Sequence, residues 1–361
     1  MAEPATRTDG PATTWPWHSD VDVERFDRLG IERLPRYGTI TRYRTVTSDG
    51  LQRMVLYGRT DVRRRAARTV DLTVGTAPPM GMGTDGMMTH FVLKAMEKGV
   101  DALLFGPEHV PPELRGDAGR SPPAAGAISL AGSGHALHRI ADHVADAHGT
   151  DLGTMLWSGI SLGALKGIAF NVLAPSYRRV LAYSHYAAPV CPDAVEPPTD
   201  REYRRWLVGE LGAMVRMSSE LMWKDLRDRS FPIHLDVLRV LRPPLSAHYG
   251  RSVSPSGQRR LCVHEWQREV TSGVVGLAAE LLPAGRLTTF ELFAGDGFES
   301  SWRQRLAAPI AAGTTRVIVE AGRHSDAVRL SAQRRRAWFM RSVIESLDSG
   351  TPIDELVHPA G

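Results

Sequence analysis

The chain has 361 residues, 42% of them hydrophobic and 23% charged, which is the composition of a folded globular protein. This composition excludes a largely disordered chain, a collagen-like repeat and a coiled-coil rod. The 44 Lys and Arg residues outnumber the 40 Asp and Glu residues only slightly, so we expect no nucleic acid partner.

Signals for targeting and for disulfides are weak. The first twenty residues lack the apolar run of a signal peptide, and nowhere do 18 apolar residues follow one another. The two cysteines, Cys191 and Cys262, are too few for a disulfide framework and suit a reducing compartment. We therefore expect a cytoplasmic protein with no membrane span.

From residue 39 onward, strand-like and helix-like segments alternate. Two segments with strand character, 39–47 and 51–57, flank the turn sequence Ser48-Asp49-Gly50 and predict a β-hairpin. Beyond it, apolar or β-branched runs predict strands over 70–74, 100–105, 152–157 and 180–183, and apolar residues at helical spacing predict helices over 87–98, 135–148 and 161–173. This alternation favours an α/β fold with a mostly parallel central sheet and helices on both faces.

Residues 192–282 interrupt the alternation with helical patterns and no convincing strand. Strands are then predicted over 288–293 and 316–320, with a helix near 300–312 between them and a final amphipathic helix over 327–347. We therefore divide the chain into an N-terminal tail (1–36), a core (37–191 and 283–361) and an inserted helical cap (192–282). The run Arg334-Arg335-Arg336 on the final helix is interpreted as a solvated face.

The sequence Gly159-Ile160-Ser161-Leu162-Gly163 matches the pattern G-x-S-x-G. The pattern alone is weak, but here it follows a predicted strand and opens a predicted helix. A serine on such a sharp turn projects its hydroxyl beyond the strand, and the flanking glycines let helix and strand approach closely. The amino end of the helix also offers free N–H groups and positive potential to an oxyanion. Ser161 is therefore the candidate nucleophile.

An acid and a histidine follow in the order that such a nucleophile requires. Asp296 lies in the run Ala294-Gly295-Asp296-Gly297 that follows the predicted strand 288–293, and His324 comes after the strand 316–320. Because parallel strands end at one edge of a sheet, both residues would lie near Ser161. Three other carboxylates compete with Asp296 for the role of the acid: Asp193 after an earlier strand, Asp326 two residues beyond His324, and Glu108 at the turn after the strand 100–105.

With these motifs the sequence resembles the α/β-hydrolase superfamily, in its serine esterase and lipase branch, from about residue 39 to about residue 347. Residues 100–109 resemble the fourth strand of that fold and the turn after it. The resemblance implies that Ser161, His324 and Asp296 form a triad that cleaves a carboxylic ester through an acyl-enzyme. It implies a small-molecule ester or acyl substrate, and neither a metal nor another cofactor.

The oxyanion hole departs from the family pattern. The N–H of Leu162, directly after the nucleophile, is the first candidate donor. These enzymes usually carry a His-Gly pair after the third strand, next to the second donor, but the loop 75–81 has none and contains two prolines, which lack an N–H. Met80 is the candidate second donor, and a hydroxyl such as that of Thr76 is an alternative.

Several other functions remain open. Acyl transfer, or thioesterase, peptidase or lactonase activity, would use the same triad. A non-catalytic binding protein with this fold would need no oxyanion hole, and the missing His-Gly pair favours it. A Rossmann dinucleotide-binding oxidoreductase is a remote alternative, because residues 81–86 match G-x-G-x-x-G. However, six residues, two of them prolines, separate this glycine run from the preceding strand, where the pyrophosphate turn should follow closely.

Overall fold

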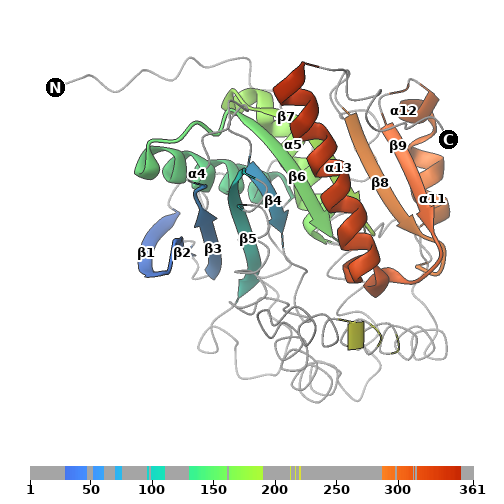
Figure 1. Cartoon of the computed structure of the whole chain (residues 1–361), viewed down its shortest axis with the longest axis horizontal. Helices are drawn as coiled ribbons and strands as arrows, with labels where there is room; N and C mark the ends of the chain where they lie inside the picture. The colour runs from blue at the N-terminus through green and yellow to red at the C-terminus, as the bar shows by residue number, and fades with distance from the viewer. Residues whose placement is uncertain are drawn as a thin grey trace.

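The computed structural model describes residues 29–46, 52–60, 70–74, 96, 99–109, 130–160, 162–189, 212, 216, 219–220, 287–296, 299–311, 313 and 315–350. These residues contain one nine-stranded sheet with helices packed on both of its faces (Figure 1). The α/β class and the mostly parallel central sheet predicted from the sequence are therefore confirmed.

The strands are, in chain order, β1 (Gly30–Tyr37), β2 (Ile40–Val46), β3 (Gln52–Gly58), β4 (Val70–Val74), β5 (Asp101–His109), β6 (Thr154–Ile160), β7 (Val180–Ala187), β8 (Leu287–Phe293) and β9 (Thr315–Glu320). The helices are α4 (Leu130–His148), α5 (Leu162–Leu173), α11 (Glu299–Arg305), α12 (Ala307–Ala311) and α13 (Leu330–Ser349), with the short 3-10 helices η2 (Ala174–Tyr177) and η6 (His324–Val328).

The strand order is β1-β2-β3-β5-β4-β6-β7-β8-β9. The first three strands pair antiparallel with one another, and β3 pairs antiparallel with β5. From β5 through β4 and β6 to β9 every pair is parallel, so these six strands all end at the same edge of the sheet. This strand order, with β6 leading directly into α5, is the arrangement of the α/β-hydrolase fold that the sequence resembles.

The two faces of the sheet bury separate hydrophobic clusters, because alternate side chains of a strand point to opposite faces. On one face, Trp157 of β6 packs in a cluster with Ile168 and Phe170 of α5. On the other face, its neighbour Leu156 packs in a cluster with Phe339 of α13. Each fully buried side chain of this size stabilises the fold by about 1.5–3 kcal/mol. The central strands are therefore held from both sides.

The structure differs from the sequence prediction at β1. No strand was predicted before residue 39, yet β1 pairs with β2 along its length, so the boundary drawn at residue 36 falls inside a strand. None of residues 30–36 is buried, so the sequence of this strand shows only a weak alternation of apolar and polar residues. Pro35 weakens the strand signal further, although a proline is tolerated on an edge strand such as this one.

The predicted final helix also begins differently. Its first turn is the separate 3-10 helix η6, and α13 starts only at Leu330. Most of the predicted helix 87–98 and of the predicted cap 192–282 lies outside the described residues. Within these segments Met96 and residues 212, 216, 219 and 220 are helical. The cap therefore stays a prediction.

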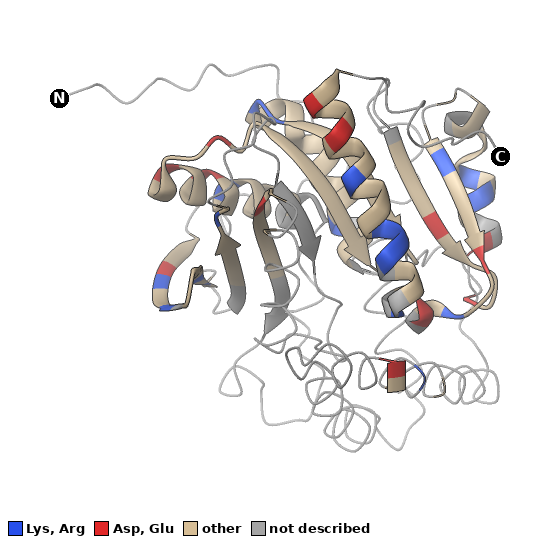
Figure 2. Cartoon of the chain, in the orientation of Figure 1, with Lys and Arg blue, Asp and Glu red and all other residues tan. Residues whose placement is uncertain are grey.

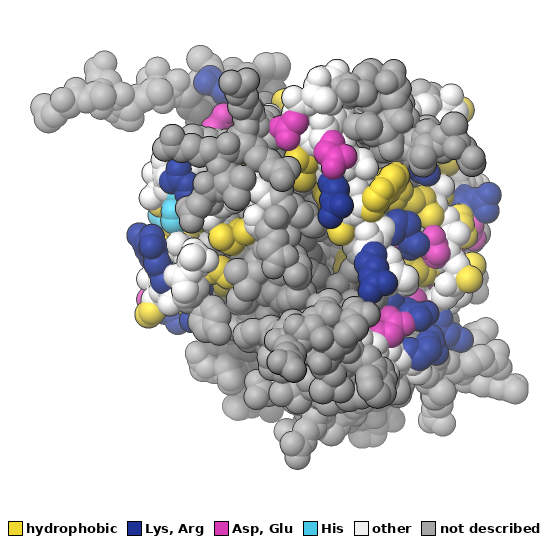
Figure 3. Space-filling view, in the orientation of Figure 1, with side chains coloured by type: hydrophobic (Ala, Val, Ile, Leu, Met, Phe, Trp, Pro, Cys, Tyr) yellow, Lys and Arg dark blue, Asp and Glu magenta, His cyan; other side chains and the backbone are white. Residues whose placement is uncertain are grey.

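The surface over α13 carries both signs of charge. Figure 2 shows basic residues in the half of α13 near η6 and acidic residues toward its carboxyl end. In Figure 3, apolar side chains on this face are scattered between charged ones. The large apolar side chains that are exposed among the described residues are Val180, Ile310, Val319 and Trp338. Single exposed apolar residues of this kind are ordinary on protein surfaces.

Candidate active site

The sheet brings the three predicted site segments to one edge. Its register pairs Ile160, the last residue of β6, with Ala187 of β7, and Ala187 with Glu291 of β8. The last residues of β8 and β9, Phe293 and Glu320, pair with each other. Because neighbouring strands lie about 4.8 Å apart, β6 and β8 are separated by only about 10 Å. The residues that follow β6, β8 and β9 therefore emerge close together.

The junction between β6 and α5 is tight. A Cβ atom on Gly159 would lie 2.4 Å from the carbonyl oxygen of Gly163 and 2.6 Å from the indole Nε1 of Trp157. A Cβ atom on Gly167 would lie 2.0 Å from the same indole nitrogen. Only glycine fits at either position, so the first turns of α5 lie directly against the end of β6, as the G-x-S-x-G pattern requires.

Ser161, the predicted nucleophile, lies outside the described residues. Its chain neighbours are the last residue of β6, Ile160, and the first residue of α5, Leu162. The backbone N–H of Leu162 belongs to the first turn of the helix, where N–H groups have no intrahelical acceptor. Met80, the predicted second oxyanion donor, and Thr76 also lie outside the described residues.

Asp296 and His324 are in direct contact. The Nδ1 atom of His324 lies 2.9 Å from Oδ2 of Asp296, at hydrogen-bond distance. The two side chains are only 3% (Asp296) and 9% (His324) exposed. An ionised carboxylate can only accept, so Nδ1 donates its proton, and in a neutral His324 the Nε2 atom is then the ring nitrogen that accepts. No described residue donates a hydrogen bond to the other carboxylate oxygen of Asp296, Oδ1, which is buried.

Backbone hydrogen bonds hold the two loops against each other. The N–H of Gly295 donates to the carbonyl oxygen of Gly322 at 2.7 Å, and the N–H of Ala294 donates to that of Glu320 at 3.0 Å. A Cβ atom on Gly295 would lie 2.5 Å from the Gly322 oxygen, and Gly322 itself has a φ of +143°, which favours glycine. The separation of Asp296 and His324 is therefore set by the backbone as well as by their own contact.

The competing carboxylates lie elsewhere or outside the described residues. Asp326 accepts the N–H of Arg323 at 2.7 Å, and its carboxylate lies 3.5 Å from the guanidinium of Arg216. Glu108 was predicted at a turn, but it lies inside β5, which continues to His109 because β3 pairs with it that far. Asp193 is not among the described residues. Of the three candidates among the described residues, Asp296 is the one that the structure places against His324.

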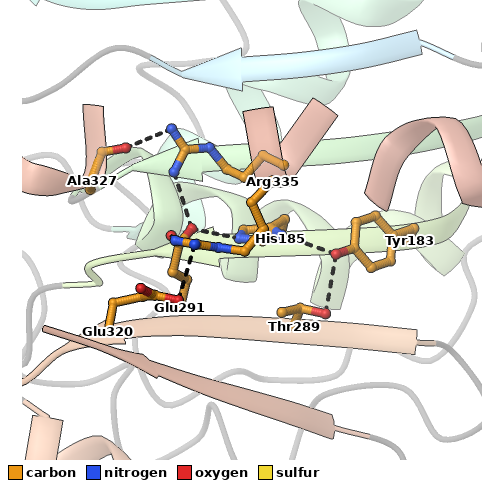
Figure 4. A network of polar contacts seen from close by, with 8 residues as sticks. Tyr183, His185, Thr289, Glu291, Glu320, Ala327 and Arg335 are labelled. Atoms are coloured by element: carbon orange, nitrogen blue, oxygen red, sulfur yellow. Dashed lines mark hydrogen bonds and ion pairs between the residues drawn. The ribbon is translucent and has the colours of Figure 1, made fainter. Parts of the chain in front are cut away.

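A second histidine–carboxylate pair lies beneath the loops, between the sheet and α13 (Figure 4). His185 of β7 and Glu291 of β8 are both fully buried, with 2.9 Å between His185 Nε2 and Glu291 Oε2. The other ring nitrogen, Nδ1, lies 3.0 Å from the hydroxyl of Tyr183. Two guanidinium groups of α13 also reach Glu291: Arg335 contacts Oε1, and Arg336 Nη1 donates to Oε2 at 3.1 Å.

The electrostatics of this cluster give each group a definite charge. Burial lowers the pKa of His185 and outweighs the hydrogen bond and negative charge of Glu291, which raise it. The charges of Arg336 and Arg335 add to the lowering, so the imidazole is neutral. Burial alone would raise the pKa of Glu291. The hydrogen bond from His185, the positive charge of Arg336 and the hydrogen bond from Arg335 outweigh burial and lower the pKa of Glu291 to about 2. Two carboxylates, those of Glu291 and Glu320, therefore balance two guanidinium groups.

The sequence analysis missed this cluster and misjudged part of it. Arg334-Arg335-Arg336 was interpreted as a solvated face, but Arg336 is buried and Arg335 is half-buried against Glu291; Arg334 alone is exposed. The signal was Glu291 itself, a charged residue within the apolar strand LTTFELF. A charge in a strand that is covered on both faces needs a partner of opposite charge.

Within the described part of the chain, no group of three or more His, Cys, Asp or Glu side chains is arranged to hold a metal ion. None of the described helices is both long enough and apolar enough to cross a lipid bilayer.

Comparison with known proteins gives no match by sequence: no protein-family model and no curated protein matches the chain. Solved structures match by shape. The acetyl xylan esterase from Paenibacillus sp. R4 has a TM-score of 0.46 and 14% identity, over 91% of this chain and 92% of that one. Acetyl xylan esterase 1 from Thermoanaerobacterium sp. JW/SL YS485 has a TM-score of 0.46 and 10% identity, over 90% and 93%.

The bromoperoxidase from Bacillus anthracis has a TM-score of 0.45 and 11% identity, over 80% of this chain and 95% of that one. Identities this low establish no shared activity. The function of this chain therefore has to be inferred from its own residues.

Proposed function

We propose that this protein is a serine hydrolase that cleaves a carboxylic ester, with Ser161 as nucleophile, His324 as general base and Asp296 as the residue that orients His324. The contact between His324 Nδ1 and Asp296 Oδ2 carries the proposal. A buried carboxylate on Nδ1 fixes the tautomer that leaves Nε2 as an acceptor, which is the task of the acid in a serine triad. Both residues follow strands that end at the same sheet edge as β6, the strand before Ser161.

The proposed reaction has two halves. In the first, Nε2 of His324 removes the proton of the Ser161 hydroxyl while its oxygen attacks the ester carbonyl, and the same proton then passes to the departing alcohol. In the second, His324 removes a proton from water, whose oxygen attacks the acyl-enzyme, and returns it to Ser161 as the acid leaves. Asp296 stabilises the imidazolium that forms in each half. These steps need no metal and no organic cofactor.

The oxyanion is held by backbone N–H groups. Leu162 supplies one of them from the first turn of α5, where the positive end of the helix also favours negative charge. Met80 supplies the second. The substrate is a small ester with an apolar acyl or alcohol part, since Met80, Met82, Met87 and Met88 place four adaptable apolar side chains in and after the same loop.

A fluorophosphonate probe tests the proposal directly, because it reacts only with an activated serine. We expect it to label Ser161 in the native protein and not in the denatured protein, with the site located by mass spectrometry. Ser161→Ala should abolish labelling, whereas Ser158→Ala, which removes a hydroxyl from the same strand, should leave it. Ser161→Ala should also lower the hydrolysis of p-nitrophenyl esters by about 10³-fold or more.

The same experiment separates the alternatives. A native protein that stays unlabelled and hydrolyses no ester would be a binding protein with this fold. Labelling of Ser161, combined with faster ester cleavage when a second alcohol or a thiol is added, would identify an acyltransferase. Faster turnover of thioesters than of oxygen esters would identify a thioesterase.

A further inference from the structure

We propose that the buried cluster of Glu291, Arg335 and Arg336 positions the turn that carries His324, and that Arg336 is the positioning residue that transmits this effect. The inference rests on the proposed function, in which His324 is the general base. The hydrogen bonds and ion pairs described for these three side chains join them to one another, to His185 and to the chain on either side of His324. Their effect on the reaction is therefore expected through the backbone on either side of it.

The two arginines contact the chain on both sides of His324, at Glu320 and at Ala327, which Figure 4 labels. Glu320 is the last residue of β9, four positions before His324, and its carboxylate lies 3.0 Å from Arg335 Nη1. Ala327 lies three positions after His324, and its carbonyl oxygen accepts a hydrogen bond from Arg336 Nη2 at 2.6 Å. The segment between these two points contains His324. The backbone bonds described above and the contact between His324 and Asp296 join it to the loop that carries Asp296.

Glu291 fixes both arginines to the sheet. It is fully buried in β8, and each of its carboxylate oxygens contacts one of the two guanidinium groups. The same strand leads into Asp296 five residues later. The cluster therefore joins the strand that carries the acid to both ends of the turn that carries the base. A shift of Arg336 would move His324 relative to Asp296 without removing any atom from either.

The chemistry of Arg336 suits this role. Its planar guanidinium donates to Glu291 with one nitrogen and to the Ala327 carbonyl with another, which the compact ammonium of a lysine cannot do in the same geometry. The side chain is only 7% exposed, so water cannot readily replace either bond. Because misplacement of a reacting group by about 1 Å can cost about 10²-fold in rate, a small displacement of the turn suffices for a large effect.

The test compares Arg336→Met with Arg179→Met in the full-length protein. Arg179 is a matched control because it is also a buried arginine, with contacts to His138 and to Asp142, but it precedes β7 at the opposite edge of the sheet. For each variant we would measure the melting temperature, kcat and KM for a p-nitrophenyl ester well below melting. We would also record the downfield proton signal of the His324 Nδ1–H, assigned by its loss in Asp296→Asn.

Both variants should lower the melting temperature. We expect Arg336→Met alone to lower kcat, by about tenfold or more, with KM changed by less than about twofold, and to shift or weaken the downfield signal. Arg336→Lys keeps the charge beside Glu291 and should fold in any case. It should fall between Arg336→Met and the native protein in kcat, and it decides the question should Arg336→Met fail to fold.

Equal kcat values and unchanged downfield signals in the variants at both positions would overturn the proposal and leave Arg336 with a purely stabilising role. The proton signal keeps this outcome separate from a failure of the proposed function. If the native protein cleaves no ester, the proposed function fails. The downfield signal would still test the positioning of His324 by Arg336. A signal that changes in the Arg336 variants and not in Arg179→Met would support it, and a signal that changes in neither would refute it.

Discussion

Replacing Gly159 by alanine should disrupt the junction between β6 and α5 while adding only one methyl group. The new Cβ would lie 2.4 Å from the carbonyl oxygen of Gly163 and 2.6 Å from its carbonyl carbon, both backbone atoms of the first turn of α5. Ordinary contacts begin at 3.4 Å, so the helix would have to withdraw from the strand by about 1 Å. Ser161 lies in the chain between the two glycines and would move with the helix.

A displacement of this size should cost about 10²-fold in kcat, because nucleophile and base would no longer be aligned. Overpacking of the junction should also cost about 1–3 kcal/mol of stability. The assays are ester hydrolysis, the rate of fluorophosphonate labelling, and urea unfolding.

Gly153→Ala is the matched control for this prediction. Gly153 precedes β6 at the other end of the strand, and its new Cβ would meet the exposed carboxylate of Asp151, at 2.9 Å, and no backbone atom of a helix. This variant should keep its activity. A Gly159→Ala protein with the kcat and stability of the native protein would refute the argument that only glycine fits at the junction between β6 and α5.

Three further predictions concern titratable groups. Asp296→Asn should lower kcat by about 10²- to 10⁴-fold with little change in KM, whereas Asp193→Asn should leave kcat unchanged. If Asp193→Asn loses activity and Asp296→Asn keeps it, Asp193 is the acid of the triad. In the folded protein, kcat/KM should rise with pH across the range in which histidines titrate, roughly pH 5 to 8, because only neutral His324 accepts a proton, and a flat profile would exclude a histidine base. The pKa of Glu291 is about 2 in the folded protein, against an ordinary value of 4.5. Its ionised form therefore stabilises the fold above pH 4.5 by about 3 kcal/mol. This contribution is lost as the pH falls toward 2. The difference in unfolding free energy between native protein and Glu291→Gln should therefore be smaller at pH 3 than at pH 7, and equal differences at the two pH values would contradict this assignment.

Local signals made most of the sheet predictable. The parallel strands are rich in apolar and β-branched residues, which marked them as strands even where, as in β9, they are only partly buried. The strand predicted over 70–74 was found with those bounds, and the two late strands were found to within one residue at their starts. The placement of Asp296 and His324 followed from the same logic, because parallel strands end at one edge. The alternation of strands and helices implied a parallel sheet, and a parallel sheet places the loops of these two residues side by side.

Features that depend on distant partners could not be predicted in the same way. His185 and Glu291 are 106 residues apart, and Arg335 and Glu291 are 44 apart, so neither contact leaves a periodic pattern in the sequence. An arginine triplet on an amphipathic helix resembles a solvated face unless the carboxylate that it meets is known. β1 was missed for a different reason: its pairing with β2 supplies stability that its own weak hydrophobic pattern does not reveal.

The neighbouring strands β7 and β8 are separated in the chain by residues 188–286, and this separation matters while the protein is being synthesised. At translation rates of about 5–20 residues per second, residue 296 is added roughly 7–27 s after residue 161. During that interval β7 has no β8 beside it and exposes a row of unpaired N–H and C=O groups along its edge. Nascent chains therefore keep an open strand edge until β8 has left the ribosome, and they carry the proposed nucleophile without its proposed acid and base until residues 296 and 324 have followed.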